Sequence, residues 1–370
     1  MPEFSQRLSA SASRSLTSDS IKQRARESGF DLCGVAPAQA FPELAFFRQW
    51  IDRGYAGTMG YLPRSAERRS DVRKVLRSAQ SVIVTGTLYN GGHPYSTERA
   101  DATRGEIARY AWSRDYHHVI GERLDALLAW MRSRQDEPFD ARAYVDTGPI
   151  QERVFAQYAG LGWIGKNTCV INPELGSWLL LGVIVSSLTL EPDAPALDQC
   201  GTCTLCLDAC PTGAFAAPYQ LDATQCVSYQ TIEYRGSIPD AYRDAIGNHI
   251  FGCDVCQEVC PWNLSPTRIA DLSWSSRQEL NLTSLIDLWR RSDDELAAFI
   301  GDSAMTRTGV KGLRRNLAVA LGNSGDERAL TVLAETIDNG TRNDPLVIEH
   351  VQWAKRTLTH VCGSVQPGPE

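Results

Sequence analysis

The cysteines of this chain constrain its fold more than any other feature. Eight of the eleven lie between Cys200 and Cys260. The first half of that stretch reads C-x2-C-x2-C-x3-C-P and ends at Pro211, and a shorter run, C-x2-C-x3-C-P, begins at Cys253 and ends at Pro261. Three closely spaced thiolates can bind three corners of an iron–sulfur cube, while the fourth, next to a proline, reaches a second cube. The spacing therefore predicts two [4Fe–4S] clusters.

The same pattern predicts which cysteines share a cluster. One cluster is expected to take Cys200, Cys203, Cys206 and Cys260, and the other Cys210, Cys226, Cys253 and Cys256. Residues 227–252 are inserted within the second set, where an ordinary ferredoxin has about two residues, and they are numerous enough to form a surface of their own. Zinc has no use for a third cysteine at this spacing, and disulfides require an oxidising compartment, so both alternatives fit less well.

Length, charge and hydropathy set further bounds. A chain of 370 residues suggests about two or three domains. The net charge of −7 means that any nucleic-acid contact must come from a local basic patch. The N-terminal segment lacks the apolar stretch of a signal peptide, so we expect residues 1–17 to form a flexible tail and the protein to be cytoplasmic. The uncharged run from Trp178 to Leu190 is too short to span a bilayer and predicts a buried strand or hairpin.

Strands alternating with helices up to about residue 190 predict an α/β or α+β layer. We expect helices at 18–29, 44–51, 117–131 and 151–158, strands at 30–35, 81–88 and 143–145, and a strand pair at 170–171 and 178–186 around the turn at Asn172-Pro173. After the cysteine-rich stretch, helices are expected at 293–300, 307–321, 327–337 and from Asp344-Pro345 onward, where an N-cap precedes a proline.

The predicted fold class is therefore α+β, with three domains after the tail. Residues 18–190 form an N-terminal α/β domain, 191–270 a ferredoxin-like domain with two [4Fe–4S] clusters, and 271–365 a helical segment whose paired amphipathic helices look like HEAT repeats.

The helix at 307–321 has a basic side. Its members, spaced so that they share one face, are Arg307, Lys311, Arg314 and Arg315. Charged helix faces are commonly plain solvated surface, and phosphate binding is the alternative that the sequence leaves open.

Asp146 follows the predicted strand at 143–145, where ligand sites of layered folds tend to lie. It either caps the helix that starts near Pro149 or acts as a general acid, if apolar walls such as Trp163 keep its proton near neutral pH. Lys166 and Asn167 either hold an anionic or amide-bearing ligand or cap their own loop. Two cubanes imply one-electron chemistry relayed to an acceptor, and no G-x-G-x-x-G follows a strand to indicate a nucleotide cofactor.

Several segments together resemble the epoxyqueuosine reductase family. They are RYAWSRDYH from Arg109 to His117, VDTGP from Val145 to Pro149, GWIGKN ending at Asn167, both cysteine runs, CVSYQTIE from Cys226, and LRRNLAVALG from Leu313. The cysteine runs alone are shared with many proteins, but the combination is specific, and it extends over residues 20–360.

The resemblance implies a cobalamin-dependent iron–sulfur oxidoreductase whose N-terminal, cobalamin-binding domain is related to that of reductive dehalogenases. Such an enzyme reduces the epoxide of epoxyqueuosine at the wobble position of tRNA to queuosine, using cob(I)alamin, electrons relayed by the clusters and a proton from Asp146. We expect cob(II)alamin to be bound base-off without a histidine ligand. The sequence from Asp115 to Gly121 has its glycine one residue too late for a cobalt-binding D-x-H-x-x-G motif, so His117 is expected to be structural or on the surface.

The resemblance also implies binding residues and partners. Contacts to cobalamin are expected from Arg69, Arg109, Asp146, Lys166, Asn167, Ser228, Gln230 and Asp254, and contacts to the tRNA anticodon stem-loop from Lys311, Arg314 and Arg315. We further expect an external one-electron donor such as a flavodoxin or ferredoxin, no membrane association and a monomer.

Two other functions are compatible with the residues. One is a reductive dehalogenase-like corrinoid enzyme acting on a small molecule, for which the sequence shows no twin-arginine export signal. The other is a two-cluster electron-transfer subunit, which would bind no cobalamin.

Overall fold

The computed structural model describes residues 16–99, 101–264, 271–277, 283–335 and 340–363. The predicted tail at 1–17 lies almost entirely outside these ranges. Residues 336–337 of the predicted helix 327–337 and residues 364–365 of the predicted C-terminal domain lie outside them as well.

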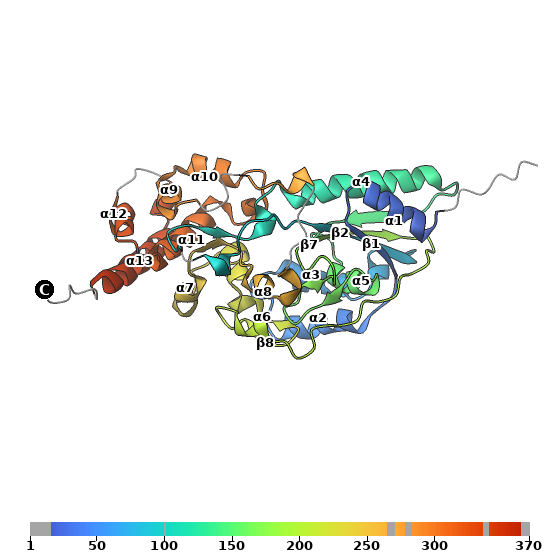
Figure 1. Ribbon diagram of the computed structural model, residues 1–370, viewed down its shortest axis with the longest axis horizontal. Coiled ribbons are helices and arrows are strands. Elements are labelled where there is room, and N and C mark those ends of the chain that lie inside the picture. The colour runs from blue at the N-terminus through green and yellow to red at the C-terminus, as the bar shows by residue number, and fades with distance from the viewer. Residues whose placement is uncertain (1–15, 100, 265–270, 278–282, 336–339, 364–370) are drawn as a thin grey trace, which may run out of the picture.

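A four-stranded sheet forms the centre of the N-terminal part (Figure 1). Its strands are β1 (Leu32–Pro37), β2 (Ser81–Leu88), β7 (Leu179–Ser186) and β4 (Ala141–Tyr144), in that spatial order, and every neighbouring pair is antiparallel. The strands predicted at 30–35, 81–88 and 143–145 are confirmed, with small shifts at the ends of the first and last. The uncharged run from Trp178 is also confirmed as a buried strand, β7.

The predicted strand pair around Asn172-Pro173 is wrong. β6 (Val170–Ile171) pairs with β5 (Trp163–Ile164), whereas β7 pairs with β2 and β4 in the central sheet. A bridge between Asn172 and Gly176 closes a tight turn after β6, and the chain then leaves for another sheet. Two adjacent apolar runs joined by a turn are therefore not sufficient evidence for a hairpin.

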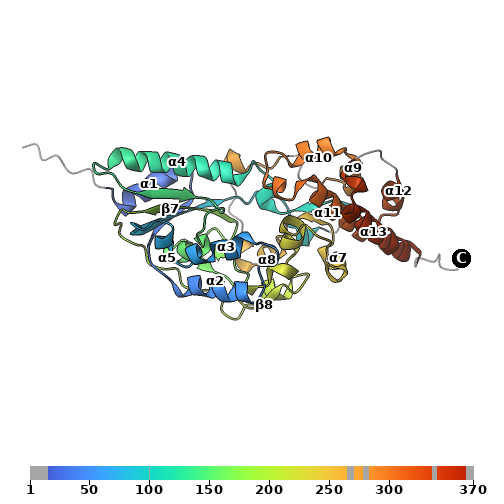
Figure 2. The same ribbon diagram turned by 180° about the vertical axis from the view of Figure 1, so that it is seen from behind.

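Helices cover both faces of the central sheet. α1 (Ser18–Glu27) and α4 (Tyr116–Arg134) lie on one face, and α2 (Pro42–Asp52), α3 (Tyr61–Arg69) and α5 (Glu152–Tyr158) lie on the other (Figures 1 and 2). Because side chains alternate along a strand, Ile83 belongs to the core under α1 and α4, while Val84 belongs to the core under the opposite helices. The four helices predicted in this part are confirmed, and Thr17 caps α1 in place of Ser18 or Asp19.

The cysteine-rich stretch contains only short elements. They are α6 (Leu205–Asp208), β8 (Phe215–Ala217), β9 (Gln220–Leu221), a π-helical turn (Tyr229–Glu233), α7 (Asp240–Ile246), β10 (His249–Phe251) and α8 (Val255–Glu258). β8 pairs with β9, and β10 pairs in parallel with β3 (Glu106–Ile107). The second pairing joins the inserted residues 227–252 to the N-terminal part.

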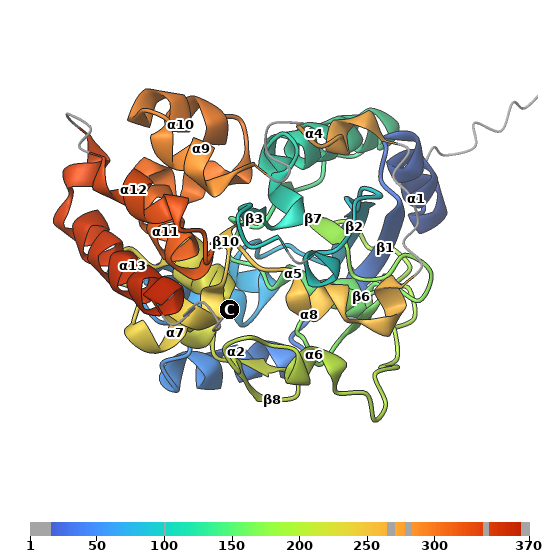
Figure 3. The ribbon, with the colours of Figure 1, turned by 60° about the vertical axis from the view of Figure 1, so that its left-hand side comes forward.

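The remaining helices gather at the end of the molecule away from the central sheet (Figures 1 and 3). They are α9 (Leu285–Arg290), α10 (Asp293–Ile300), α11 (Gly309–Asn323), α12 (Arg328–Ala334) and α13 (Pro345–Gly363). The predicted cap is confirmed, because Asp344 Oδ1 accepts the N–H of Leu346 at 2.9 Å ahead of α13. Apolar side chains of β3, the inserted residues and these helices share one core, with Ile107, Val227 and Leu313 among its members.

None of the described helices is long and apolar enough to cross a membrane.

Candidate active site and iron–sulfur segment

Several of the predicted cluster ligands lie near other cysteines of their own predicted set. Burial raises the pKa of the Cys206 thiol to about 11, and its next largest influences are the other predicted ligands of the same cluster, Cys260, Cys200 and Cys203. Burial likewise raises the pKa of Cys226 to about 11, and the nearby thiols are those of its own predicted set, Cys253 and Cys210. Cys256 lies near Cys169, which is not a predicted ligand, and near Cys253 and Cys226 of its own predicted set. Within each set, cysteines from both halves of the stretch therefore lie near one another.

Both sets suit an iron–sulfur cluster chemically. Burial and the neighbouring thiols raise the pKa of Cys206, Cys226 and Cys253 and so oppose thiolate formation, and bound iron ions would remove that opposition. Backbone N–H groups also point at the sulfurs: Ala214 N lies 3.3 Å from Cys210 Sγ. Burial raises the pKa of Cys260, and a hydrogen bond from the backbone of Trp262 opposes the rise. Such bonds tune the reduction potential of a cluster, so the donor set fits two [4Fe–4S] clusters.

Lys166 and Asn167 link the loop after β5 to both cysteine runs. Lys166 Nζ donates to the carbonyls of Gly201 and Cys203, at 2.7 and 2.9 Å. Asn167 is buried, and its Nδ2 donates to the carbonyl of Cys256 at 3.1 Å. The two side chains therefore hold one loop of each thiol group against the N-terminal part.

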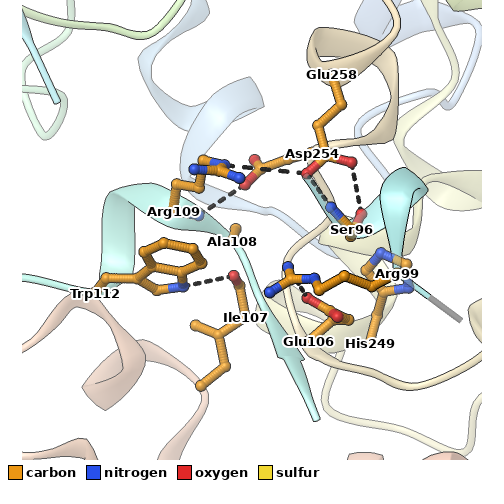
Figure 4. A pocket seen from close by; sticks show the side chains of 10 residues that line it. All are labelled: Ser96, Arg99, Glu106, Ile107, Ala108, Arg109, Trp112, His249, Asp254 and Glu258. Carbon is orange, nitrogen blue, oxygen red and sulfur yellow. Dashed lines mark hydrogen bonds and ion pairs between the residues drawn. The ribbon is translucent and has the colours of Figure 1, made fainter. Parts of the chain in front are cut away.

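Arg109 and Asp254 form a second buried link (Figure 4). The backbone N–H of Arg109 donates to Asp254 Oδ2 at 2.7 Å. The guanidinium donates to the carbonyls of His93 and Pro94, at 2.9 and 2.7 Å, and lies over the ring of Trp112. Arg109 is only 3% exposed, and both terminal nitrogens of its guanidinium donate to residues 90–94, so its place is structural: it fixes that loop beside α8.

The other predicted cofactor contacts differ in their burial and in whether their polar atoms already have hydrogen-bond partners. Gln230, in the turn after Cys226, is 2% exposed; its Nε2 donates to the carbonyl of Thr224, and its Oε1 is buried without a partner. Ser228 precedes this turn and is half-buried. Arg69 donates to the carbonyl of Ile150 at 2.9 Å and so touches the loop that carries Asp146. A buried, unpaired amide oxygen is a place where an amide-bearing ligand can donate a hydrogen bond.

Asp146 lies in the loop between β4 and α5, with a left-handed backbone (φ 55°) that aspartate tolerates better than most residues. Its side chain is 66% exposed. Tyr116 Oη donates to Asp146 Oδ2 at 3.1 Å, and His117 Nε2 lies 3.6 Å from the same oxygen. The backbone N–H of Asp146 donates to Glu152 Oε1 at 2.8 Å.

The predicted setting of Asp146 against apolar walls is wrong. Trp163 is completely buried and packs against Trp262, with ring centroids 5.0 Å apart. The neighbours of Asp146 are polar, and the interaction with His117 holds the pKa of Asp146 below its ordinary value. In this state the Asp146 carboxyl is ionised at neutral pH.

Three residues beside Asp146, namely Tyr116, His117 and Glu152, were not predicted from the sequence as residues of this site. Burial alone would lower the pKa of His117, but its hydrogen bond to Asp115 and its interaction with Asp146 raise it to about 9. Burial, followed by the charge of Asp146, raises the pKa of Glu152 to about 8. Tyr116 reaches Asp146 through its hydroxyl. The RYAWSRDYH segment contained a signal for two of them, because it ends in Tyr116 and His117, but the helix pattern gave no indication that they reach Asp146.

All three parts of the chain contribute to the surroundings of Asp146. Arg307 and Glu233, from the C-terminal part and the turn after Cys226, form an ion pair at 2.9 Å. The Arg307 guanidinium lies 5.5 Å from the centroid of the Tyr61 ring on α3. The charge of Asp146 acts on both Tyr61 and Arg307. Asp146 therefore lies where α3, the turn after Cys226 and the short helical turn before α11 (Ala304–Arg307) meet.

The prediction that Lys311, Arg314 and Arg315 share an exposed basic face is wrong for the two arginines, which are each 1% exposed. Arg315 donates to the carbonyls of Gln230, Tyr234 and Gly236. Arg314 donates to the carbonyls of Trp289 and Arg291 and to Asp293. Neighbouring elements cover the side of α11 that the spacing suggested was open. Lys311 is half-exposed and lies 3.4 Å from Asp344.

Two family models match this chain. One, described as a 4Fe-4S double cluster binding domain, matches residues 199–263, and the other, described as epoxyqueuosine reductase QueG, DUF1730, matches residues 69–147. The first match covers all eight predicted cluster ligands, and the second ends just after Asp146.

Individual relatives match over nearly the whole chain. The epoxyqueuosine reductase of Xanthomonas campestris pv. campestris is 40% identical over 341 residues, which cover 90% of this chain and 94% of the relative. A solved epoxyqueuosine reductase with an epoxyqueuosine-modified tRNA-Tyr stem-loop has a TM-score of 0.81 and 30% identity, covering 94% of each chain. Another, from Bacillus subtilis, described with an aspartate-bearing catalytic loop swung out of the active site, has a TM-score of 0.79 and 30% identity, covering 92% of this chain and 90% of that one.

The iron–sulfur model thus spans the whole cysteine-rich stretch. The chain belongs to the epoxyqueuosine reductase family.

Proposed function

We propose that this chain removes the epoxide oxygen of epoxyqueuosine at the wobble position of tRNA, with Asp146 delivering a proton to that oxygen. The observation that carries the proposal is the place of Asp146, on an exposed loop where the N-terminal part, the turn after Cys226 and Arg307 meet. An epoxide oxygen leaves as an alkoxide, which is a poor leaving group unless a positioned acid protonates it.

Two [4Fe–4S] clusters are the resident electron carriers in this proposal. Cys200, Cys203, Cys206 and Cys260 hold one, and Cys210, Cys226, Cys253 and Cys256 hold the other. Lys166 and Asn167 keep both cysteine runs in place against the sheet domain, so the distance over which electrons travel is fixed by protein contacts.

Cobalamin is the acceptor that we propose between the clusters and the substrate. When bound, it supplies a cobalt centre that takes electrons from the clusters and uses them to cleave a carbon–oxygen bond. The unpaired Oε1 of Gln230 is suited to accept a hydrogen bond from one of its amide side chains, with Ser228 beside it. Arg69, Arg109 and Asp254 shape the surrounding loops. We expect cob(II)alamin, base-off, without a histidine ligand, because His117 is engaged by Asp115 and faces Asp146.

The tRNA anticodon stem-loop is proposed to contact two exposed cations, Arg307 just before α11 and Lys311 in its first turn. Arg307 and Lys311 have about half of their side chains exposed and carry this role in place of the buried Arg314 and Arg315. The Arg307 side chain is near enough to Asp146 for the charge of Asp146 to raise its pKa. A nucleotide inserted towards Asp146 would therefore bring its phosphates near Arg307 and Lys311.

Further proposals concern the setting of the enzyme. We propose a cytoplasmic monomer that receives single electrons from a flavodoxin or ferredoxin. Its layout would comprise a cobalamin-binding domain at 18–190, a two-cluster domain at 191–270 and a HEAT-like tRNA-binding segment at 271–365.

Asp146→Asn tests the acid directly. The amide keeps the shape of the side chain but has no carboxyl proton to transfer, so we expect conversion of an epoxyqueuosine-bearing stem-loop to fall by at least about 100-fold. Bound iron and cobalamin should be unchanged. Asp125→Asn, the same change at an exposed position on α4, is the control and should keep full turnover. If Asp146→Asn retains wild-type turnover, Asp146 is not the acid.

A further inference from the structure

The proposed reaction needs more protons than Asp146 supplies in its resting state. Removing an epoxide oxygen as water breaks two carbon–oxygen bonds and consumes two electrons and two protons. The interaction with His117 keeps Asp146 ionised at neutral pH, and a carboxylate cannot donate a proton. The site therefore needs a neighbouring group that holds protons and passes them to Asp146.

Asp115, His117 and Asp146 form a chain in which the imidazole stands between two carboxylates. His117 Nδ1 donates to Asp115 Oδ1 at 2.7 Å, and Nε2 lies 3.6 Å from Asp146 Oδ2. Asp115 also caps α4 by accepting the backbone N–H of His117 at 3.0 Å. The ring of Tyr116 stacks on the imidazole, with centroids 4.1 Å apart. These contacts fix the ring so that Nε2 faces Asp146.

We propose that His117 stores the proton that Asp146 passes to the substrate oxygen, with Asp115 holding the imidazole in the required orientation. This inference rests on the proposed function, since it concerns the source of that reaction's protons. His117 acts through Asp146, so it is a positioning and proton-holding residue and does not touch the substrate.

Each proton can be followed from solvent to product. As the first carbon–oxygen bond breaks, His117 Nε2 passes its proton to Asp146 Oδ2, and the carboxyl formed in this way gives that proton to the alkoxide. The imidazole is then neutral, and because its Nε2 is buried, the next proton reaches it from solvent by way of the Asp146 side chain, which is 66% exposed. A second passage protonates the hydroxyl as it leaves as water. Both electrons come from the external donor through the clusters. The 3.6 Å gap is longer than a hydrogen bond and must close, as acid–base contacts commonly do when substrate binds.

The charges that face this pair favour a proton on His117. Asp115 and Asp146 act directly on the imidazole and raise its pKa against the effect of burial. The other titratable groups around Asp146 include Tyr110 and Tyr116 before and on α4, Glu152 and Arg153 on α5, Arg69 and Tyr61 on α3, and Arg307 from the C-terminal part. Because the folded pKa of His117 lies near 9, above its ordinary value of 6.5, His117 is charged at neutral pH and loses its proton as the pH rises through about 9.

The first test is an NMR titration of the wild-type holoprotein labelled with carbon-13 in its histidine rings. Of the six histidines, burial lowers the pKa of His93 and that of His350, the latter to about 4, whereas the pKa of His117 is raised. We expect one ring to titrate with a midpoint near 9. If no histidine ring titrates above about pH 7.5, the proposal is overturned. This measurement depends on no variant and on no turnover.

The second test is the pH profile of single-turnover reduction of an epoxyqueuosine-bearing stem-loop. Wild-type turnover should fall as the pH rises through about 9. In His117→Gln, turnover at pH 8 should fall by about 100-fold and recover in part as the pH falls, because Asp146 is then protonated from solvent more often. His118→Gln is the matched control, because His118 is the next residue on α4 and is exposed. It should keep the wild-type profile.

The outcomes separate the two claims. A His117→Gln variant with the wild-type rate and pH profile would overturn the proton store and leave the proposed function standing. A wild-type chain that holds its cofactors and forms no queuosine at any pH would overturn the proposed function, and the proton store with it.

Discussion

Asp146 shows what the sequence can and cannot reveal about a single residue. Its place at the end of a strand was predictable, because β-branched and apolar runs mark strands and their ends. Its charge state was not, because the groups that set it come from the first turns of α4 and α5. No spacing rule connects an aspartate in a loop with a histidine 29 residues earlier.

Glu152 offers a separate test at this scale. Its Oε1 accepts the backbone N–H of Asp146 and so holds the acid's loop. Because burial raises its pKa to about 8, Glu152 is mostly neutral at pH 7, and Glu152→Gln preserves both the charge and the acceptor. We expect turnover of Glu152→Gln at pH 7 to stay within about 3-fold of wild type. Glu152→Ala, which removes the acceptor, should lose about 10-fold or more, since the loss of one hydrogen bond is worth about 1.4 kcal/mol. Equal losses in both variants would contradict a role for the acceptor.

At the scale of elements, the sequence predicted that α11 is a helix but not which other segments cover it. The apolar spacing of Leu313, Leu317 and Leu321 correctly indicated a buried stripe. The arginines on the other side looked like surface, yet residues 313–322 are buried all round. An arginine pattern cannot distinguish water from backbone carbonyls as the partner of its guanidinium, and here the carbonyls belong to segments about 80 residues away.

Paired substitutions on α11 separate stability from substrate binding. Arg315→Met leaves the carbonyls of Gln230, Tyr234 and Gly236 without their donor, so we expect a loss of about 3 kcal/mol in the free energy of unfolding. Lys311→Met should change stability by less than about 0.5 kcal/mol. It should weaken stem-loop binding and reduce the dependence of affinity on salt by about one unit of slope. Thermal unfolding and binding titrations at several salt concentrations measure these effects. A stable Arg315→Met variant with weakened stem-loop binding would contradict the assignment.

At the scale of the whole molecule, the cysteine spacing predicted links between the first cysteine run and the second. The thiols near Cys206 and near Cys226 belong to the sets predicted for them, and the assignment of all eight cysteines to two clusters stays a prediction. The role of the inserted residues 227–252 was not predictable. They pack with β3 and with the C-terminal helices in one core, which is a long-range association that no local pattern encodes. The cluster segment is therefore built into the fold and is not an appended carrier.

Metal and corrinoid content of the anaerobically purified chain, after incubation with cobalamin, tests the central claim most directly. The account predicts about eight iron ions and about one cobalt per chain, with a visible spectrum in which corrinoid bands change when the clusters are reduced. Zinc in place of iron, or a folded protein that retains no corrinoid, would contradict it.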